Sequence, residues 1–472
     1  MNGILCWIGG LAFALPLLYA APPASAKSQR PRVIVLTDIA NEPDDEESLV
    51  RFLVSSSDYD VEALIATTST WLRNKVHPDK IQAQIRAYAK VYPNLIKHDP
   101  RYPSAKYLLS VTRSHLPTYG MSGVGEGKDS PGSNLLIAVV DKPDPRPVWV
   151  TVWGGGNCLA QAMWKVRQTR SKTDLAKFVA KIRVYTISDQ DDCGTWLRKE
   201  FPRLFYIVTP SNQSYNEYHL ATWTGISGER RYKLAAPPSY FACISNEWLS
   251  RNVIQNHGPL GALYPKWKYI MEGDTPSFLN LIDNGLGGEI TPDYGGWGGR
   301  YKLSKPSGEP RAIWTNSADT VTADGKIWTS QHATVWRWRE AYQNDFAARM
   351  DWCITAKRQD ANHHPAARVN GRGGKSVISI NAKPRQTVTL SAAGSSDPDG
   401  NKITYRWFQY LEAGSTSRTD ISGKDTNTIT FTTPNEPNKT LHIILELRDN
   451  GTPNLFTYRR TIVTITDPPP SP

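Results

Sequence analysis

The stretch Arg32-Val-Ile-Val-Leu-Thr-Asp38-Ile-Ala-Asn-Glu-Pro-Asp44-Asp45 carries the strongest architectural signal in this sequence. Four apolar residues stand in one run, from Val33 to Leu36, and predict a buried strand. After an acidic loop, Leu49, Phe52 and Leu53 recur at helical spacing. A buried strand that leads directly into a helix indicates the first unit of an α/β fold.

The alternation of strands and helices continues downstream. Further strands are expected at residues 61–68, 148–152, 182–187 and 204–208, with helices at 81–92 and from 159 onward, and a long helix over 331–355. This order predicts an α/β class with a mostly parallel sheet flanked by helices. In such sheets the ligand lies at the carboxyl ends of the strands.

A different pattern begins after residue 375. Short segments alternate between apolar and polar residues at 386–391, 403–408, 428–432, 441–447 and 460–466, with turn residues between them. They predict a small C-terminal β-sandwich of the immunoglobulin-like or cadherin-like size, with Trp407 in its core. The expected organisation is a signal peptide at 1–26, an α/β domain at 27–357, a linker at 358–374, the β-sandwich at 375–467 and a disordered tail at 468–472.

The first 26 residues contain no charged side chain, and residues 4–20 are almost entirely apolar. Ala24-Ser25-Ala26 offers small residues at the spacing of a signal-peptidase site. A membrane anchor is the alternative, but Pro16 and two further prolines interrupt a spanning helix. We therefore expect a secreted or periplasmic protein that has no membrane segment after cleavage.

The net charge of +11 comes from scattered basic residues, without a long Lys/Arg run. Such a distribution favours a solubilising surface over a nucleic-acid partner. Cys158, Cys193, Cys243 and Cys353 remain after the signal and could form two disulfides in an exported protein. None stands in a Cys-x-x-Cys pair, so a zinc site is not expected.

Four carboxylates lie within the eight residues from Asp38 to Asp45: Asp38, Glu42, Asp44 and Asp45. Capping of the following helix explains one Asp well. It does not explain Asp38 and Glu42 in the same loop, because crowded carboxylates repel one another unless a cation joins them. A hard, oxygen-binding ion such as Ca²⁺ would relieve the repulsion.

This loop resembles the D-T-D-P-G-x-D-D segment of nucleoside hydrolases. Thr37-Asp38 and Asp44-Asp45 match the two ends of that pattern. Leu36 replaces the first Asp, and the loop is two residues longer, with Asn41-Glu42-Pro43 inside it. The resemblance therefore points to a divergent branch and not to an ordinary nucleoside hydrolase.

Two later segments resemble the same family. Thr151-Val-Trp-Gly-Gly-Gly156-Asn157 is similar to the loop in which the carbonyl before an Asn binds calcium, here the carbonyl of Gly156. Met271-Glu-Gly-Asp274 is similar to the segment that supplies the last Asp ligand, although Gly273 stands where the family has His. With the segments at 272–279 and 294–301, residues 31–467 resemble secreted cellulose-binding proteins that pair a nucleoside-hydrolase-like domain with a small β-sandwich.

The resemblance implies a role for each matching residue. Asp38, Asp45, the Gly156 carbonyl and Asp274 would hold Ca²⁺, and Asp38 would also act as the base that takes a proton from water. Asp44 would bind a sugar hydroxyl, and Asn157 would anchor the loop beside the substrate.

The acid that protonates the leaving group is less determined, because the family's His is missing. Glu272 is the first candidate, and the alternatives are Asp189, Asp191, Asp192 and His332. Asp189 and Asp192 are also expected at the substrate, because their run follows a strand. Indole rings stack on sugar faces, so Trp71, Trp153 and Trp297 are expected to contact the ligand as well.

Two functions follow. The first is a calcium-dependent glycosidase that cleaves an N- or O-glycosidic bond of a carbohydrate or nucleoside-like substrate with metal-activated water. The alternative is a non-catalytic protein that binds cellulose or another polysaccharide on the same scaffold.

Overall fold

The computed structural model describes residues 30–210 and 218–466. The predicted signal peptide and C-terminal tail lie outside these residues. Across the two ranges, no helix is both long and apolar enough to cross a bilayer.

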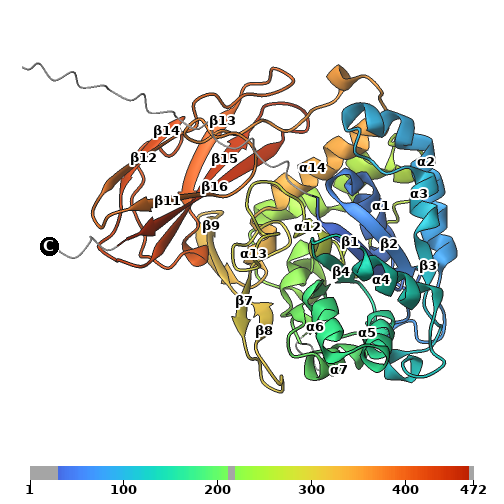
Figure 1. Ribbon diagram of the computed structural model, residues 1–472. Coiled ribbons are helices and arrows are strands. Elements are labelled where there is room, and N and C mark those ends of the chain that lie inside the picture. The colour runs from blue at the N-terminus through green and yellow to red at the C-terminus, as the bar shows by residue number, and fades with distance from the viewer. Residues whose placement is uncertain (1–29, 211–217, 467–472) are drawn as a thin grey trace, which may run out of the picture.

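An eight-stranded sheet forms the centre of the α/β domain, with the order β3-β2-β1-β4-β5-β6-β8-β7 (Figure 1). All neighbours pair in parallel except β7 and β8, which are antiparallel. This confirms the mostly parallel sheet. The strands are β1 (Arg32–Thr37), β2 (Asp60–Ala66), β3 (Thr112–Ser114), β4 (Val148–Val152), β5 (Ile182–Thr186), β6 (Phe205–Ile207), β7 (Tyr301–Ser304) and β8 (Ile313–Asn316).

Helices cover both faces of the sheet. Val33 and Val35 of β1 belong to one buried apolar cluster, and Ile34 and Leu36 belong to the other. Because successive side chains of a strand point to opposite faces, a continuous apolar run is required when both faces are covered. The helices are α1 (Asp44–Val54), α2 (Pro78–His98), α3 (Ala105–Ser110), α4 (Pro131–Asp141), α5 (Asn157–Thr169), α6 (Lys172–Ala180), α7 (Cys193–Glu200), α9 (Glu229–Tyr232), α10 (Asn246–Leu249), α11 (Gly258–Gly261), α12 (Pro276–Leu279), α13 (Ala333–Trp336) and α14 (Arg339–Trp352).

The strand order reverses between β1 and β4. From β1 the chain proceeds outward to β2 and β3, and then returns to β4 on the other side of β1. The carboxyl ends of β1 and β4 therefore diverge into loops on opposite sides, which leaves a crevice between them. Asp38 follows the end of β1, and Trp153 follows the end of β4.

The long helix expected over 331–355 is divided into α13 and α14. Trp338 stands at the break, and its ring packs against Tyr410 and Tyr458 of the C-terminal region. Packing against a second domain therefore takes precedence over helical continuity here. The sequence reasoning also missed β7, β8 and the hairpin of β9 (Asp319–Ala323) and β10 (Lys326–Ser330).

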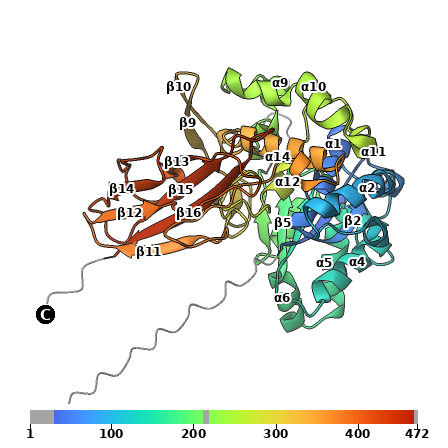
Figure 2. The ribbon, with the colours of Figure 1, turned by 90° about the horizontal axis from the view of Figure 1, so that it is seen from above.

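The C-terminal region is β-rich, as predicted (Figure 2). A four-stranded sheet of order β11-β16-β15-β13 and a two-stranded sheet of β12 and β14 enclose one apolar cluster. Trp407 is 2% exposed within this cluster. The strands are β11 (Ile378–Ala382), β12 (Thr387–Ser391), β13 (Thr404–Gln409), β14 (Thr428–Thr432), β15 (Thr440–Arg448) and β16 (Phe456–Ile465).

The segment predicted as a linker packs between the two parts of the molecule. His363 stacks on Trp352 and His98, and its backbone N–H donates to Asp399 at 2.7 Å. Asn362 donates to Asp449 of the sandwich at 3.0 Å. No disulfide joins any of the four cysteines that the described residues contain.

Candidate functional site

A cavity of about 440 Å³ lies at the carboxyl ends of β1 and β4. Its lining includes the carboxylates of Asp38, Asp44, Asp45 and Asp274, which come from two segments far apart in the chain. Its walls are largely aromatic, and two cations stand among them. These wall residues are Asn41, Glu42, Trp71, Trp153, Gln190, Tyr218, Trp223, Arg231, Tyr232, Lys268, Tyr269 and Ile270.

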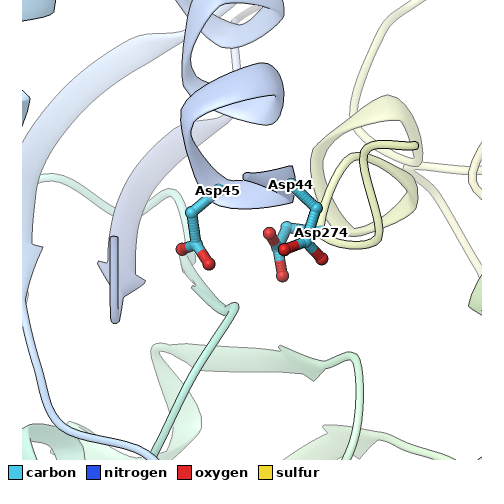
Figure 3. Close-up of side chains that lie close together, drawn as sticks. All are labelled: Asp44, Asp45 and Asp274. Atoms are coloured by element: carbon cyan, nitrogen blue, oxygen red, sulfur yellow. The ribbon is translucent and has the colours of Figure 1, made fainter. Parts of the chain in front are cut away.

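Three of the aspartates form a compact cluster. Figure 3 shows Asp44 and Asp45 at the start of α1, with the loop that carries Asp274 beside them. One carboxylate oxygen from each lies within 4.8 Å of the others. The backbone N–H groups at the start of a helix favour negative charge, which helps to seat Asp44 and Asp45 there. The sequence analysis expected Asp44 to bind a sugar hydroxyl. The structure also places its carboxylate close enough to Asp45 and Asp274 for the three to share one cation.

The carboxylates of this cluster are electrostatically strained. Burial first and then the neighbouring Glu42 and Asp38 raise the pKa of Asp44 to about 8. Burial and the charges of Asp38 and Asp44 raise the pKa of Asp45, and burial and the other aspartates raise that of Asp274. Each shift reports a charge that the bare protein does not accommodate well.

Within residues 30–210 and 218–466, no Lys or Arg forms an ion pair with these four aspartates. Asp38 Oδ1 and Asp274 Oδ2 are buried, and neither has a hydrogen-bond partner among the residues that the structure describes. Thr37 Oγ1 donates to Asp45 Oδ1 and orients that carboxylate. Crowded oxygen ligands with unused lone pairs fit a hard cation such as Ca²⁺.

Asp38 is 3% exposed and lines the cavity beside the cluster. Gly154, which follows β4, lies against it, since a Cβ at this position would stand 2.3 Å from Asp38 Oδ1. Burial raises the pKa of Asp38, and a hydrogen bond with Ser69 opposes that shift. The missing side chain at Gly154 therefore allows the loop after β4 to pack directly against the Asp38 carboxylate.

Two residues of the glycine-rich loop, Gly156 and Asn157, are absent from the cavity lining within the described residues. Gly156 is not among the described residues that line the cavity, and its carbonyl accepts a helical hydrogen bond from Ala160 N at 2.9 Å. Asn157 is fully buried, and its amide donates to Thr68 Oγ1 and Thr118 O, both at 2.8 Å. Asn157 therefore anchors the loop, and its assignment to substrate binding is corrected.

Glu272 is also corrected. Its side chain is fully buried and lies 2.5 Å from Arg51 Nε. Tyr264 donates to the same carboxylate at 2.7 Å, and Thr275 donates to it at 3.0 Å. Both oxygens are thus engaged in an internal ion pair away from the cavity lining, which removes Glu272 from the candidate acids.

The acidic run after β5 serves structure as well. Asp189 forms a buried ion pair with Arg198 at 2.8 Å. Asp192 is exposed, and its Oδ1 accepts from Met121 N at 2.8 Å. Neither lines the cavity in the described part of the chain, so their assignment to substrate is corrected.

The other candidate acids, Asp191 and His332, are placed no better. Asp191 is 3% exposed and accepts from Cys193 N at 2.9 Å. His332 Nε2 lies 2.8 Å from the carbonyl oxygen of His219. In the described ranges, both stand outside the cavity lining.

The expected aromatic residues divide into two groups. Trp71, 40% exposed, and Trp153, fully buried, both line the cavity. Trp297 is 1% exposed and belongs to the apolar cluster that also contains Tyr458, so its assignment to substrate is corrected. The glycines around Trp297 allow this segment to pack closely against neighbouring backbone. A Cβ at Gly298, for example, would stand 2.3 Å from Pro276 O.

Sequence reasoning missed several wall residues, including Trp223, Tyr269, Arg231 and Lys268. Trp223 and Arg231 lie in short helical turns, and Lys268 and Tyr269 lie in an irregular segment, and none of them belongs to a motif or a periodic pattern. Glu42 was noticed only as an additional acid, yet it stands on the cavity wall. Burial and the charge of Asp38 raise its pKa to about 7.

Comparisons with known proteins identify the family of both parts of the chain. Residues 32–301 match the family model described as "Cellulose-binding Sde182, nucleoside hydrolase-like domain", and residues 387–465 match "Cellulose-binding protein Sde0182, C-terminal domain". Among curated proteins, none matches at a significant level.

A solved structure of similar sequence is a nucleoside hydrolase-related protein from Saccharophagus degradans that is associated with carbohydrate metabolism. It is 41% identical, covers 93% of this chain and 100% of its own, and has a TM-score of 0.78. The effector XopQ complexed with adenosine diphosphate ribose aligns at 11% identity over 69% of this chain and 95% of its own. Its TM-score of 0.31 is too low to support an argument. The chain therefore belongs to the family of cellulose-binding proteins with a nucleoside hydrolase-like domain.

Proposed function

We propose that this protein is a secreted, calcium-dependent glycosidase that hydrolyses an N- or O-glycosidic bond of a carbohydrate. One observation carries the proposal: three buried carboxylates and the half-buried Asp44 meet in the crevice between β1 and β4, and two of the buried oxygens have no partner within the described residues. A sugar-binding role accords with the family's association with cellulose.

The residues that would hold calcium are Asp45, Asp274 and Asp44, with Asp38 beside them. Bound there, Ca²⁺ would neutralise the cluster, orient the sugar hydroxyls and lower the pKa of a nearby water. We assign the general base to Asp38, because it lines the cavity and its Oδ1 accepts no hydrogen bond from the described part of the chain.

The leaving group requires a second carboxyl that lies outside the metal cluster. Glu42 is such a group, since it lines the same cavity from the inserted part of the loop. A base and an acid on separate carboxyls, with a water between them, constitute the inverting arrangement. Trp71 and Tyr269, 40% and 52% exposed, offer ring faces for the sugar at the mouth.

The proposal is tested by measuring the release of reducing ends from a panel of glycans and aryl glycosides, with calcium and with a chelator. Asp38→Asn should lower turnover by about 10²–10⁴-fold, the usual contribution of general acid–base catalysis. Asp79→Asn, at an exposed Asp at the start of α2, is the matched control and should leave turnover unchanged. If no substrate is cleaved but the protein is retained on insoluble polysaccharide, the non-catalytic binding role is the correct one.

Secretion is tested separately. The small residues at Ala24-Ser25-Ala26 predict that exported protein begins at Lys27. Amino-terminal sequencing of protein from the extracellular or periplasmic fraction should find this end. Retention of the full chain in the membrane fraction would instead support an anchor.

A further inference from the structure

A second cavity, of about 530 Å³, adjoins the first one. Asn41, Glu42 and Lys268 line both, so these side chains form a shared wall between two spaces. Each space lies within the roughly 300–1,000 Å³ that small-ligand sites occupy.

The shared wall is built from the part of the acidic loop that departs from the nucleoside hydrolase pattern, Asn41-Glu42-Pro43. Ala40, at the entry to this segment, has a φ of 84°, a conformation that residues with a Cβ rarely adopt. Tyr269, next to Lys268 in the chain, has a φ of 57°. Strained residues of this kind concentrate at ligand-binding segments, where the surrounding structure holds them in place.

The lining of the second cavity suits sugar hydroxyls. Lys80, Lys266 and Lys268 supply donors, and Glu42, Glu46 and Asn41 supply acceptors. Lys266 and Lys268 are exposed, and neither has a recorded ion pair or hydrogen bond to another described residue. Such groups are available to a ligand without the loss of an internal contact.

The mouth of the first cavity is marked by Trp71 and Tyr269, the two exposed aromatic rings in its wall. One ring can support the sugar whose bond reacts above the aspartates. The next sugar along a chain then lies beyond Glu42, in the second cavity.

The geometry points to a second saccharide subsite in the cavity between α2 and residues 263–268, so that the substrate is a glycan chain of two or more units lying across Glu42. This inference rests on the proposed function only for the position of the reacting bond. It excludes a nucleoside-sized molecule as the preferred ligand.

Ala83 offers a direct test, because it lines the second cavity alone and is exposed on α2. Ala83→Trp should fill the subsite without contact to the aspartates. Ala89→Trp, at another exposed alanine of the same helix that lies outside both cavity linings, is the matched control. Affinities are measured by calorimetry in calcium for monosaccharide methyl glycosides and for oligomers derived from cellulose, xylan and pectin.

In the wild type, affinity for at least one oligomer series should exceed that for its monosaccharide. Ala83→Trp should raise the dissociation constant of the longest oligomer by about tenfold or more and should leave that of the monosaccharide unchanged. Ala89→Trp should change neither. Equal affinities for all lengths, or equal effects of the two variants, would overturn the subsite.

The binding readout separates this inference from the proposed function. If oligomers bind with the expected length dependence but no bond is cleaved, the glycosidase fails and the subsite stands. If bonds are cleaved but Ala83→Trp leaves oligomer affinity intact, the subsite fails and the glycosidase stands. If no glycan in the panel binds, the subsite is rejected irrespective of turnover.

Discussion

The buried Asp319 and the buried aspartates of the first cavity differ in whether an arginine forms an ion pair with them. Asp319, at the start of β9, is fully buried and accepts from Arg300 at 2.7 Å, Arg337 at 2.8 Å and Tyr410 at 2.6 Å. Asp45 and Asp274, 3% and 1% exposed, form no ion pair with an arginine whose side chain the structure describes.

Their electrostatics are opposite. Burial acts to raise the pKa of Asp319, but the guanidinium groups of Arg337 and Arg300 outweigh it, and the pKa is lowered. In the cavity, burial and like charges act together and raise the pKa values of Asp45 and Asp274. Asp319 is therefore a structural ion-pair centre between the two domains, whereas the cavity is a site in which the compensating charge must come from outside the chain.

Removing the charge of Asp319 should have the largest effect on stability. Asp319→Asn leaves Arg300 and Arg337 buried without their anion, which costs about 3–5 kcal/mol. Urea denaturation should show this loss in chelator and in calcium alike. A loss that calcium restores would remove the distinction between the two sets.

Calcium should stabilise the wild type through the cavity. At a free concentration of about 100 times its Kd, an ion that binds only the folded state adds about 2.7 kcal/mol to the free energy of unfolding. Asp274→Asn should abolish this gain and, in chelator, should not destabilise the protein, because it removes a repelled charge. A strong destabilisation of Asp274→Asn in chelator would contradict this account.

In chelator, the stability of the protein should decrease with increasing pH because of the raised pKa of Asp44. The pKa of Asp44 rises from its ordinary value of 3.8 to about 8 in the fold, so the folded state binds more protons between about pH 4 and about pH 8. The contribution of Asp44 to stability is therefore present at low pH and is lost as pH increases through this window. Asp44→Asn should flatten this part of the profile of unfolding temperature against pH, and calcium should suppress it in the wild type.

The smallest effect is expected at an exposed ion pair between the domains. Arg448 of β15 lies 2.7 Å from Glu340 of α14, and their side chains are 43% and 50% exposed. Because water and salt screen such a pair, Glu340→Gln should cost at most about 1 kcal/mol. A loss comparable with that of Asp319→Asn would mean that burial is not what separates strong pairs from weak ones here.

The sequence was sufficient where the signal was local. The run from Val33 to Leu36 predicted β1, and the period-two segments after residue 375 predicted the β-rich C-terminal region. Among site residues, Asp38, Asp44, Asp45 and Asp274 line one cavity, as the motif implied. Trp71 and Trp153 join them because residues that follow parallel strands meet at one edge of the sheet.

The sequence was insufficient where the role of a residue depends on a distant partner. Glu272 is a carboxylic acid next to the motif that carries Asp274, and the sequence therefore suggested it as the catalytic acid. In the structure it is neutralised by Arg51, which lies far away in the chain. Asp189 is neutralised by Arg198. Trp297 is buried in an apolar cluster that includes Tyr458 of the C-terminal region. No periodicity indicates which carboxylate meets a guanidinium and which does not.

The amino-acid order alone thus determined the strands β1, β2, β4, β5 and β6, the parallel class of their sheet, the β-rich C-terminal region and the acidic motif, because each depends on neighbours within a few residues. Only the tertiary structure decided which acids remain without a counter-charge, which aromatic rings reach the cavity and that a second cavity adjoins the first. These properties depend on burial and on the approach of segments far apart in the chain, such as Asp45 to Asp274, or Glu42 and Lys268 in the shared wall of the two cavities. They exist only once the chain has folded.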